Sequence, residues 1–168
     1  VKIDSFAYLP VQDFGNAFST FAAQNYGAGQ SGRIKEALKK ATILSAAFSS
    51  AVAAAVFIFA ESLMRIFVNA SETEVIAAGV RYLHIEGVFY AGIGCLFLLY
   101  GFYRAIEKPG MSVVLTVISL GTRVLLAYLL AGIIGETGIW ISVPIGWLLA
   151  DITGYGYCIL KRKKLFSD

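Results

Sequence analysis

The stretch from Asp4 to Gly29, DSFAYLPVQDFGNAFSTFAAQNYGAG, is long enough to cross a lipid bilayer as one helix, yet polar residues recur along it. A helix advances about 100° per residue, and by that rule four polar side chains fall within about 80° of arc and form one stripe: Asp13, Asn16, Thr20 and Gln24. In a membrane such a stripe faces protein or a water-filled cavity rather than lipid. It therefore predicts either a polar seam between helices or a helix that lines a cavity.

Asp13 is the predicted centre of a cation site. An unpaired charge about nine residues into a span costs several kcal/mol, so the carboxyl must be paired, protonated or hydrated. Pro10 has no N–H and leaves the carbonyl of Phe6 without its helical partner, so this carbonyl can join an oxygen cage. The other predicted members supply neutral oxygens, which suit Na⁺: Gln12, Asn16, Thr20 and Gln24. A buried carboxyl also takes up H⁺, so the coupling ion is Na⁺ or H⁺. The alternative is that Asp13 only hydrogen-bonds a neighbouring helix.

The rest of the chain is more apolar. Hydrophobic residues make up 58% of the 168 residues, charged residues 15%, and the mean hydropathy is +0.72. Soluble domains have about 45–50% apolar and about 25% charged residues. The apolar residues come in blocks of about 20, the length that spans hydrocarbon. We therefore predict an all-α polytopic membrane protein, a single transmembrane helical domain over residues 1–168, with five spans at about 4–27, 37–67, 73–103, 110–134 and 138–162.

Basic residues gather in alternate loops. The first and third loops and the tail carry Arg33, Lys35, Lys39, Lys40, Arg104, Lys108, Lys161, Arg162, Lys163 and Lys164. The second and fourth loops carry Glu61, Glu72, Glu74 and Glu136 with only Arg65 and Arg81. Because positive loops stay on the cytoplasmic side, the C-terminus is predicted in the cytoplasm and the N-terminus outside. The net charge of +3 then reports topology and gives no reason to expect a nucleic-acid partner.

Two further charges, Arg123 and Asp151, lie deep in apolar runs and need partners there. At 1.5 Å per residue they lie about 18 Å and about 14 Å from the inner ends of their spans. These depths nearly match on neighbouring antiparallel helices. We predict a direct or water-bridged ion pair, which either fixes the topology or relays protons.

Patterns typical of enzymes are missing from the sequence. It has no nucleophile elbow, zinc-protease motif, phosphate loop or dinucleotide fingerprint. Cys95, Cys158 and the single His84 do not have metal-ligand spacing. We therefore expect neither catalysis nor a cofactor nor a metal centre, apart from a possible Na⁺ at Asp13.

Five short motifs together resemble the MATE family, the multidrug and toxic compound extrusion transporters. The run AFSTFAAQNYGAGQSGRIKEALKKA, Ala17 to Ala41, is similar to the end of the family's eighth helix and the basic loop after it. The later matches occur in the family's order: Glu74-Val75 with Tyr82-Leu83, the loop from Tyr103 to Pro109, Thr122-Arg123-Val124, and Gly138-Ile139-Trp140.

The resemblance implies a twelve-helix antiporter of the bacterial inner membrane, surrounded by lipid and built of two six-helix lobes. Such a transporter exports cationic or amphipathic compounds by alternating access, driven by Na⁺ or H⁺. This chain would form helices eight to twelve of the C-terminal lobe, and its partner would be the missing N-terminal lobe. Some members bind a cation at an Asp in the middle of the tenth helix, but residues 91–100 contain no carboxylate. Glu86 is the acidic residue nearest to that segment, at its outer end, which leaves Asp13 as the better candidate.

Two other functions stay open. A related flippase for lipid-linked oligosaccharide would share the lobe plan, but its cavity would be lined with Arg and Lys to hold pyrophosphate. A non-transporting membrane subunit would use the Ala- and Ser-rich segment 41–60 to pack against a partner. In every case we expect that this chain alone does not transport.

Overall fold

The computed structural model describes residues 2–161 and 165–166, and the regular secondary structure there is entirely helical. The helices are α1 Lys2–Gly27, α2 Ser31–Phe67, α3 Thr73–Gly87, α4 Tyr90–Ala105, α5 Pro109–Ile134 and α6 Glu136–Leu160. The prediction of an all-α protein is confirmed. The tail prediction includes residues 162–164, which lie outside the described residues.

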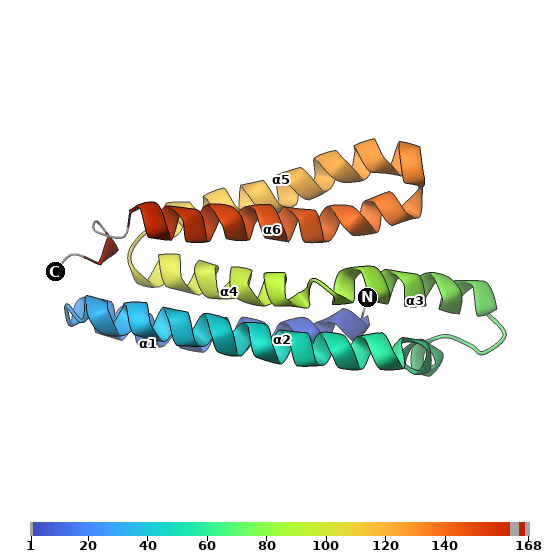
Figure 1. Cartoon of the computed structure of the whole chain (residues 1–168), viewed down its shortest axis with the longest axis horizontal. Helices are drawn as coiled ribbons and strands as arrows, with labels where there is room; N and C mark the ends of the chain where they lie inside the picture. The colour runs from blue at the N-terminus through green and yellow to red at the C-terminus, as the bar shows by residue number, and fades with distance from the viewer. Residues whose placement is uncertain (1, 162–164, 167–168) are drawn as a thin grey trace.

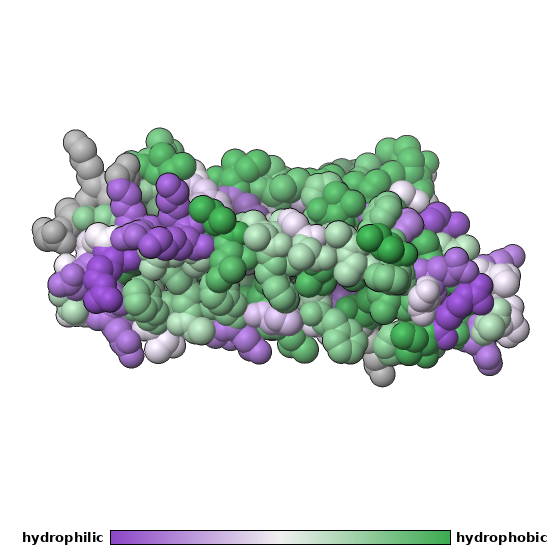
Figure 2. All heavy atoms as spheres, turned by 60° about the horizontal axis from the view of Figure 1, so that its bottom comes forward, coloured by the Kyte–Doolittle hydropathy of each residue, from purple (hydrophilic) through white to green (hydrophobic). Residues whose placement is uncertain are grey.

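The helices run up and down along one long axis, with α1 and α2 on one side, α3 and α4 end to end in the middle, and α5 and α6 on the other side (Figure 1). The α1–α2 turn, the α4–α5 turn and the end of α6 meet at one end of the molecule. The predicted basic loops are therefore at one end and the predicted acidic loops at the other. Figure 2 shows hydrophilic residues gathered at the two ends with a hydrophobic band between them, as expected of a multi-pass membrane protein.

The third predicted span, 73–103, is not one helix. It is split into α3 and α4, which meet at a bend of 52° around Val88 and Phe89. At the break, the amide of Phe89 donates to the carbonyl of Glu86 and the amide of Gly92 to that of Phe89, three residues back in each case. Gly87 is a weak helix former, and its neighbour Val88 is β-branched, which favours a break at this point. The break lies between Glu86 and Tyr90, two residues of the candidate site described below.

By length and apolar composition, fewer helices qualify as membrane spans than the five predicted. Within the described residues, three helices are long and apolar enough to cross a membrane, α2, α5 and α6, and the bent pair α3–α4 would make a fourth. With its 26 residues α1 is long enough, but its polar side chains keep it out of that group. The count of five therefore stays a prediction that depends on α1.

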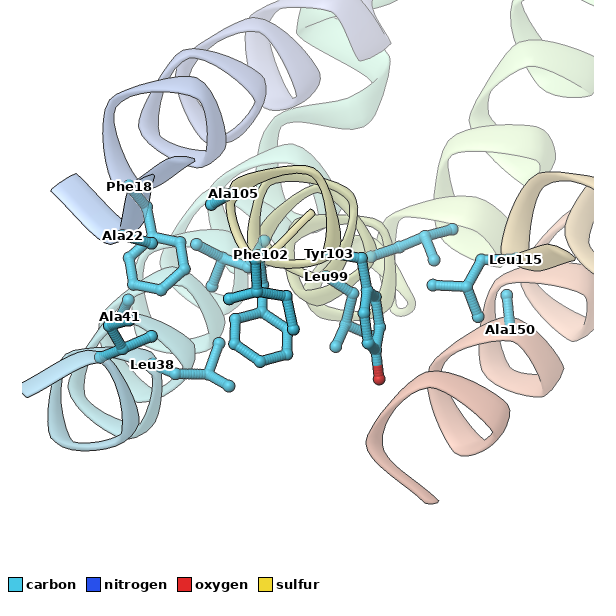
Figure 3. Packing of buried hydrophobic residues seen from close by; sticks show 14 of the residues in the cluster. Phe18, Ala22, Leu38, Ala41, Leu99, Phe102, Tyr103, Ala105, Leu115 and Ala150 are labelled. Atoms are coloured by element: carbon cyan, nitrogen blue, oxygen red, sulfur yellow. The ribbon is translucent and has the colours of Figure 1, made fainter. Parts of the chain in front are cut away.

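The hydrophobic core is built around α4, which contacts α1, α2, α5 and α6 (Figure 3). Phe102 of α4 is fully buried, and the neighbouring Tyr103 donates a hydrogen bond of 2.6 Å to the carbonyl of Gly154 on α6. Where α1 crosses α4, a Cβ on Gly101 would lie 2.5 Å from the carbonyl oxygen of Gly15, so the two backbones touch. Small residues allow this close approach, which supplies packing energy between helices in lipid. The crossing fixes the position of α1 against α4.

Candidate functional site

Two carboxyl groups from distant parts of the sequence lie together in the interior. Asp4 of α1 is 1% exposed and Glu86 of α3 is 3% exposed. The hydroxyl of Tyr82 lies between them, 2.8 Å from Asp4 Oδ2 and 2.9 Å from Glu86 Oε2. Tyr90 donates to Asp4 Oδ1 at 2.7 Å, and Tyr8 donates to Glu86 Oε2 at 3.2 Å. We call these five residues the acidic pair with its three tyrosines.

The hydrogen count of this group has a chemical consequence. A phenol carries a single hydroxyl proton, so Tyr82 can donate to one carboxylate only. Its second short contact is a hydrogen bond only if the other carboxyl holds a proton and donates to the phenol oxygen. The geometry is therefore one in which two carboxyl groups meet at a single hydroxyl, and one further proton on the pair would satisfy both contacts.

The acidic pair borders a cavity of about 300 Å³ that is lined by residues of α1, α3, α4, α5 and α6. The wall of this cavity also includes the aromatic rings of Tyr8 and Trp147, whose centroids are 6.0 Å apart at nearly a right angle. Arg123 of α5 lines the same cavity and acts electrostatically on Tyr8 and Glu86. Carboxylates beside aromatic faces form an environment that attracts organic cations.

A second cavity of about 230 Å³ lies further along α1 and shares Phe97 of α4 with the first. Its wall includes Gln12 and Asn16 of α1 and Arg104 of α4. Arg104 Nη2 donates to Asn16 Oδ1 at 3.1 Å. The two cavities are therefore neighbours at Phe97, with the acidic pair on the wall of the first and Arg104 on the wall of the second.

The predicted stripe of α1 lies apart from the acidic pair. All five residues are exposed: Gln12, Asp13, Asn16, Thr20 and Gln24. Gln12 and Asn16 reach the second cavity, and Thr20 donates to the backbone carbonyl of Asn16 at 3.3 Å. Among the described residues, Asp13 has no hydrogen bond or ion pair. Pro10 lines a third, apolar cavity against α2, away from the acidic pair. The role of the stripe in cation binding stays a prediction.

Arg123 and Asp151 are on neighbouring helices, but no direct ion pair joins them in the part of the chain that the structure describes. The side chain of Arg123 lines the cavity of the acidic pair instead. Asp151 Oδ1 is enclosed and has no hydrogen-bond partner. The expected direct pair is therefore absent from the described residues in this conformation. A water-bridged pair stays a prediction.

Sequence reasoning missed Asp4, Tyr8, Tyr82 and Tyr90, and it noted Glu86 only as a peripheral residue. A signal was present, because residues four apart lie on one face of a helix. Tyr82, Glu86 and Tyr90 follow each other at that spacing, and Asp4 and Tyr8 repeat it in the first helix. This acid–tyrosine spacing marks the two surfaces that meet in the fold.

Comparisons with known proteins agree with this architecture. The sequence model of the MatE family matches residues 1–129. The chain is 29% identical to the probable multidrug resistance protein YpnP of Bacillus subtilis (strain 168). The alignment is 171 positions long and covers 99% of this chain and 38% of that relative. It is 24% identical to the probable multidrug resistance protein YoeA of the same organism, of which it covers 36%.

The fold is also that of solved transporters. An outward-facing multidrug resistance MATE family transporter of the MOP superfamily superposes with a TM-score of 0.92 at 20% identity, over 99% of this chain and 38% of that one. An inward-facing structure of such a transporter gives a TM-score of 0.89 at 21% identity. The chain thus spans little more than a third of the length of the relatives it matches. On the match of the family's sequence model to most of its residues, this chain belongs to the MatE family.

Proposed function

We propose that the chain is part of an ion-coupled secondary transporter that exports cationic or amphipathic compounds across the bacterial cytoplasmic membrane by alternating access. The observation that carries this proposal is the acidic pair: two buried carboxyl groups, one bridging hydroxyl and a cavity beside them. A buried polar network of this kind inside a membrane protein is costly and marks an ion or substrate pathway.

The geometry suggests how coupling would work. With a proton shared between Asp4 and Glu86, the pair carries a single negative charge, which faces Arg123 across the cavity. A cationic compound that enters the cavity favours the fully ionised pair, because opposite charges attract strongly in a medium of low dielectric constant. The proton then leaves as the compound binds, and the return of a proton or Na⁺ expels the compound. Competition for one site is all that antiport requires.

The walls of the two cavities favour this cargo over the flippase alternative. The acidic pair contributes two carboxyl groups to the first cavity, whereas Arg123 and Arg104 line different cavities and Arg104 is hydrogen-bonded to Asn16. A pyrophosphate needs several convergent cations, which this arrangement does not offer. A non-transporting subunit would not need a buried pair of carboxyl groups beside a cavity.

The orientation of the proposed transporter follows the loop charges. We place the basic end, with the α1–α2 and α4–α5 turns, in the cytoplasm, together with the C-terminus. The acidic pair, close to the start of α1, then lies toward the outer half of the membrane. A proton or Na⁺ from outside would reach it first.

A transport assay on the full-length protein tests the proposal. Everted membrane vesicles that contain the whole transporter should take up a fluorescent organic cation when a proton or Na⁺ gradient is imposed, and should not flip a fluorescent lipid-linked oligosaccharide. The isolated chain of 168 residues, reconstituted in the same way, should move neither. Transport of the oligosaccharide alone would replace the proposal with the flippase function.

A further inference from the structure

A third carboxyl group, that of Asp151, lies partly buried in the lobe, outside the acidic pair. Asp151 is in the middle of α6, one helical turn beyond Trp147. Its Oδ1 is enclosed and accepts no hydrogen bond. Its Oδ2 lies against α4, 3.6 Å from the position that a Cβ would take on Gly92. This is an ordinary van der Waals separation, so the carboxyl packs directly against α4 at Gly92.

The groups around Asp151 do not neutralise a negative charge. Those that interact with it electrostatically are Cys95 and Tyr100 of α4 and Tyr155 of α6, all of which are uncharged at neutral pH. Tyr155 is already engaged, because its hydroxyl lies 2.9 Å from Thr42 Oγ1 of α2.

The charged side chains on the adjacent helices do not contact Asp151 either, because they lie against other groups. On α5, Arg123 lines the cavity of the acidic pair and makes no ion pair with Asp151 in the described part of the chain. On α3, Glu86 belongs to the acidic pair, and Arg81 pairs with Glu136 of α6 at 3.1 Å. An ionised carboxylate at Asp151 would therefore stand without compensation inside a membrane helix.

Burial of an ionised carboxylate without a partner costs far more than burial of the neutral acid, so such a group gives up its charge. We propose that Asp151 is a second proton-binding site of this lobe, which holds its own proton in this conformation and is separate from the acidic pair. Trp147 lies between the two sites, since it lines the cavity of the acidic pair and its Cβ borders the same point on Gly92. The proposal deepens the proposed function, on which it rests for its role in transport: the lobe would then hold two protons, of which a cation that binds beside the acidic pair displaces one.

The protonation state can be measured without any transport. Infrared spectra of the full-length protein in lipid at neutral pH, with carbon-13 label on aspartate, should show the C=O stretch of a protonated carboxylic acid that lacks a hydrogen bond on its carbonyl oxygen. The band should shift with the label, disappear in Asp151→Asn and persist in the matched variant Asp13→Asn. A wild-type spectrum without this band would overturn the proposal, and so would a band that survives in Asp151→Asn.

A thermal denaturation experiment separates the proposal from the water-bridged ion pair. Asparagine has nearly the shape of the protonated acid, so Asp151→Asn should leave Tm unchanged, and a double-mutant cycle with Arg123→Gln should give no coupling. A loss of Tm in both single variants that is not additive in the double variant would mean that Asp151 is ionised and paired with Arg123, which contradicts the proposal. Should the intact protein fail to export any cation, the infrared result would still stand, so the two failures are distinguishable.

Discussion

Asp4 and Asp13 are the same amino acid on the same helix, yet the structure gives them opposite surroundings. They are nine residues apart, which turns the helix by about 900°, or two and a half turns, and places them on opposite faces of α1. Asp4 is 1% exposed among the tyrosines of α3 and α4, whereas Asp13 is exposed. Depth within a span therefore does not tell whether a carboxyl is buried or exposed. Its surroundings depend on the groups that other helices bring to it.

The largest effect should follow the loss of a carboxyl in the acidic pair. Glu86→Gln and Asp4→Asn each remove the group that shares the proton, and a hydrogen bond to a charged group contributes about 1.5–3 kcal/mol. We expect ion-coupled export by the full-length protein to fall by about a hundredfold, as an efflux assay with a cationic dye would show. Normal export by both variants would remove the acidic pair from the coupling mechanism.

Tyr82→Phe should have the next largest effect. It removes the hydroxyl between the two carboxyl groups while the ring stays, and leaves both buried carboxyl groups without that hydrogen-bond partner, at a cost of about 1–3 kcal/mol. Export should fall by about tenfold or more, and Tm should fall as well. Tyr128→Phe is the matched control, because Tyr128 is 83% exposed, and it should change neither quantity. Equal behaviour of the two variants would mean that the bridge is not used.

Gly101→Ala tests whether the crossing of α1 and α4 holds Asp4 in place. The added methyl group would lie 2.5 Å from the carbonyl of Gly15, so the helices must separate, and such overpacking costs about 1–3 kcal/mol. We expect a lower Tm together with weaker coupling. Gly121→Ala on α5 adds a methyl group with no atom within 4 Å and should preserve both. If Gly101→Ala kept the full Tm, the close crossing would not be needed for stability.

Asp13→Asn should have the smallest effect on coupling, less than about threefold, since an exposed side chain loses little when its charge is removed. The interpretation drawn from the sequence is the reverse, because it makes Asp13 the centre of the cation site. Efflux rates of Asp13→Asn and Glu86→Gln, measured side by side, decide between the two. Abolished efflux in Asp13→Asn with near-normal efflux in Glu86→Gln would restore the stripe as the site.

The fold was predictable where apolar length and loop chemistry act locally. The long apolar runs and their basic and acidic loops predict α2, α5, α6 and the alternating ends. The break between α3 and α4 at Gly87 and Val88 was not predicted. Glycine and valine also occur within straight helices, and whether the helix breaks there depends on its packing against other helices.

The candidate site could not be predicted from the sequence for a similar reason, because its residues meet only through packing between helices. Asp4 and Glu86 are 82 positions apart in the sequence, and their contact exists only after α1 has crossed α4 and α3 has bent away. The four-residue spacing of Tyr82, Glu86 and Tyr90 is visible in the sequence, but nothing in that spacing says which helix it meets.

The most direct test is a count of the protons that leave when a cation binds. The purified full-length transporter in weakly buffered detergent solution, with a pH indicator, would be titrated with tetraphenylphosphonium. On the proposal that Asp4 and Glu86 share one proton, we expect the release of about one proton per bound cation from the wild type and from Asp13→Asn, and none from Glu86→Gln. Unchanged release by Glu86→Gln, or loss of release in Asp13→Asn alone, would contradict the assignment of the proton to Asp4 and Glu86.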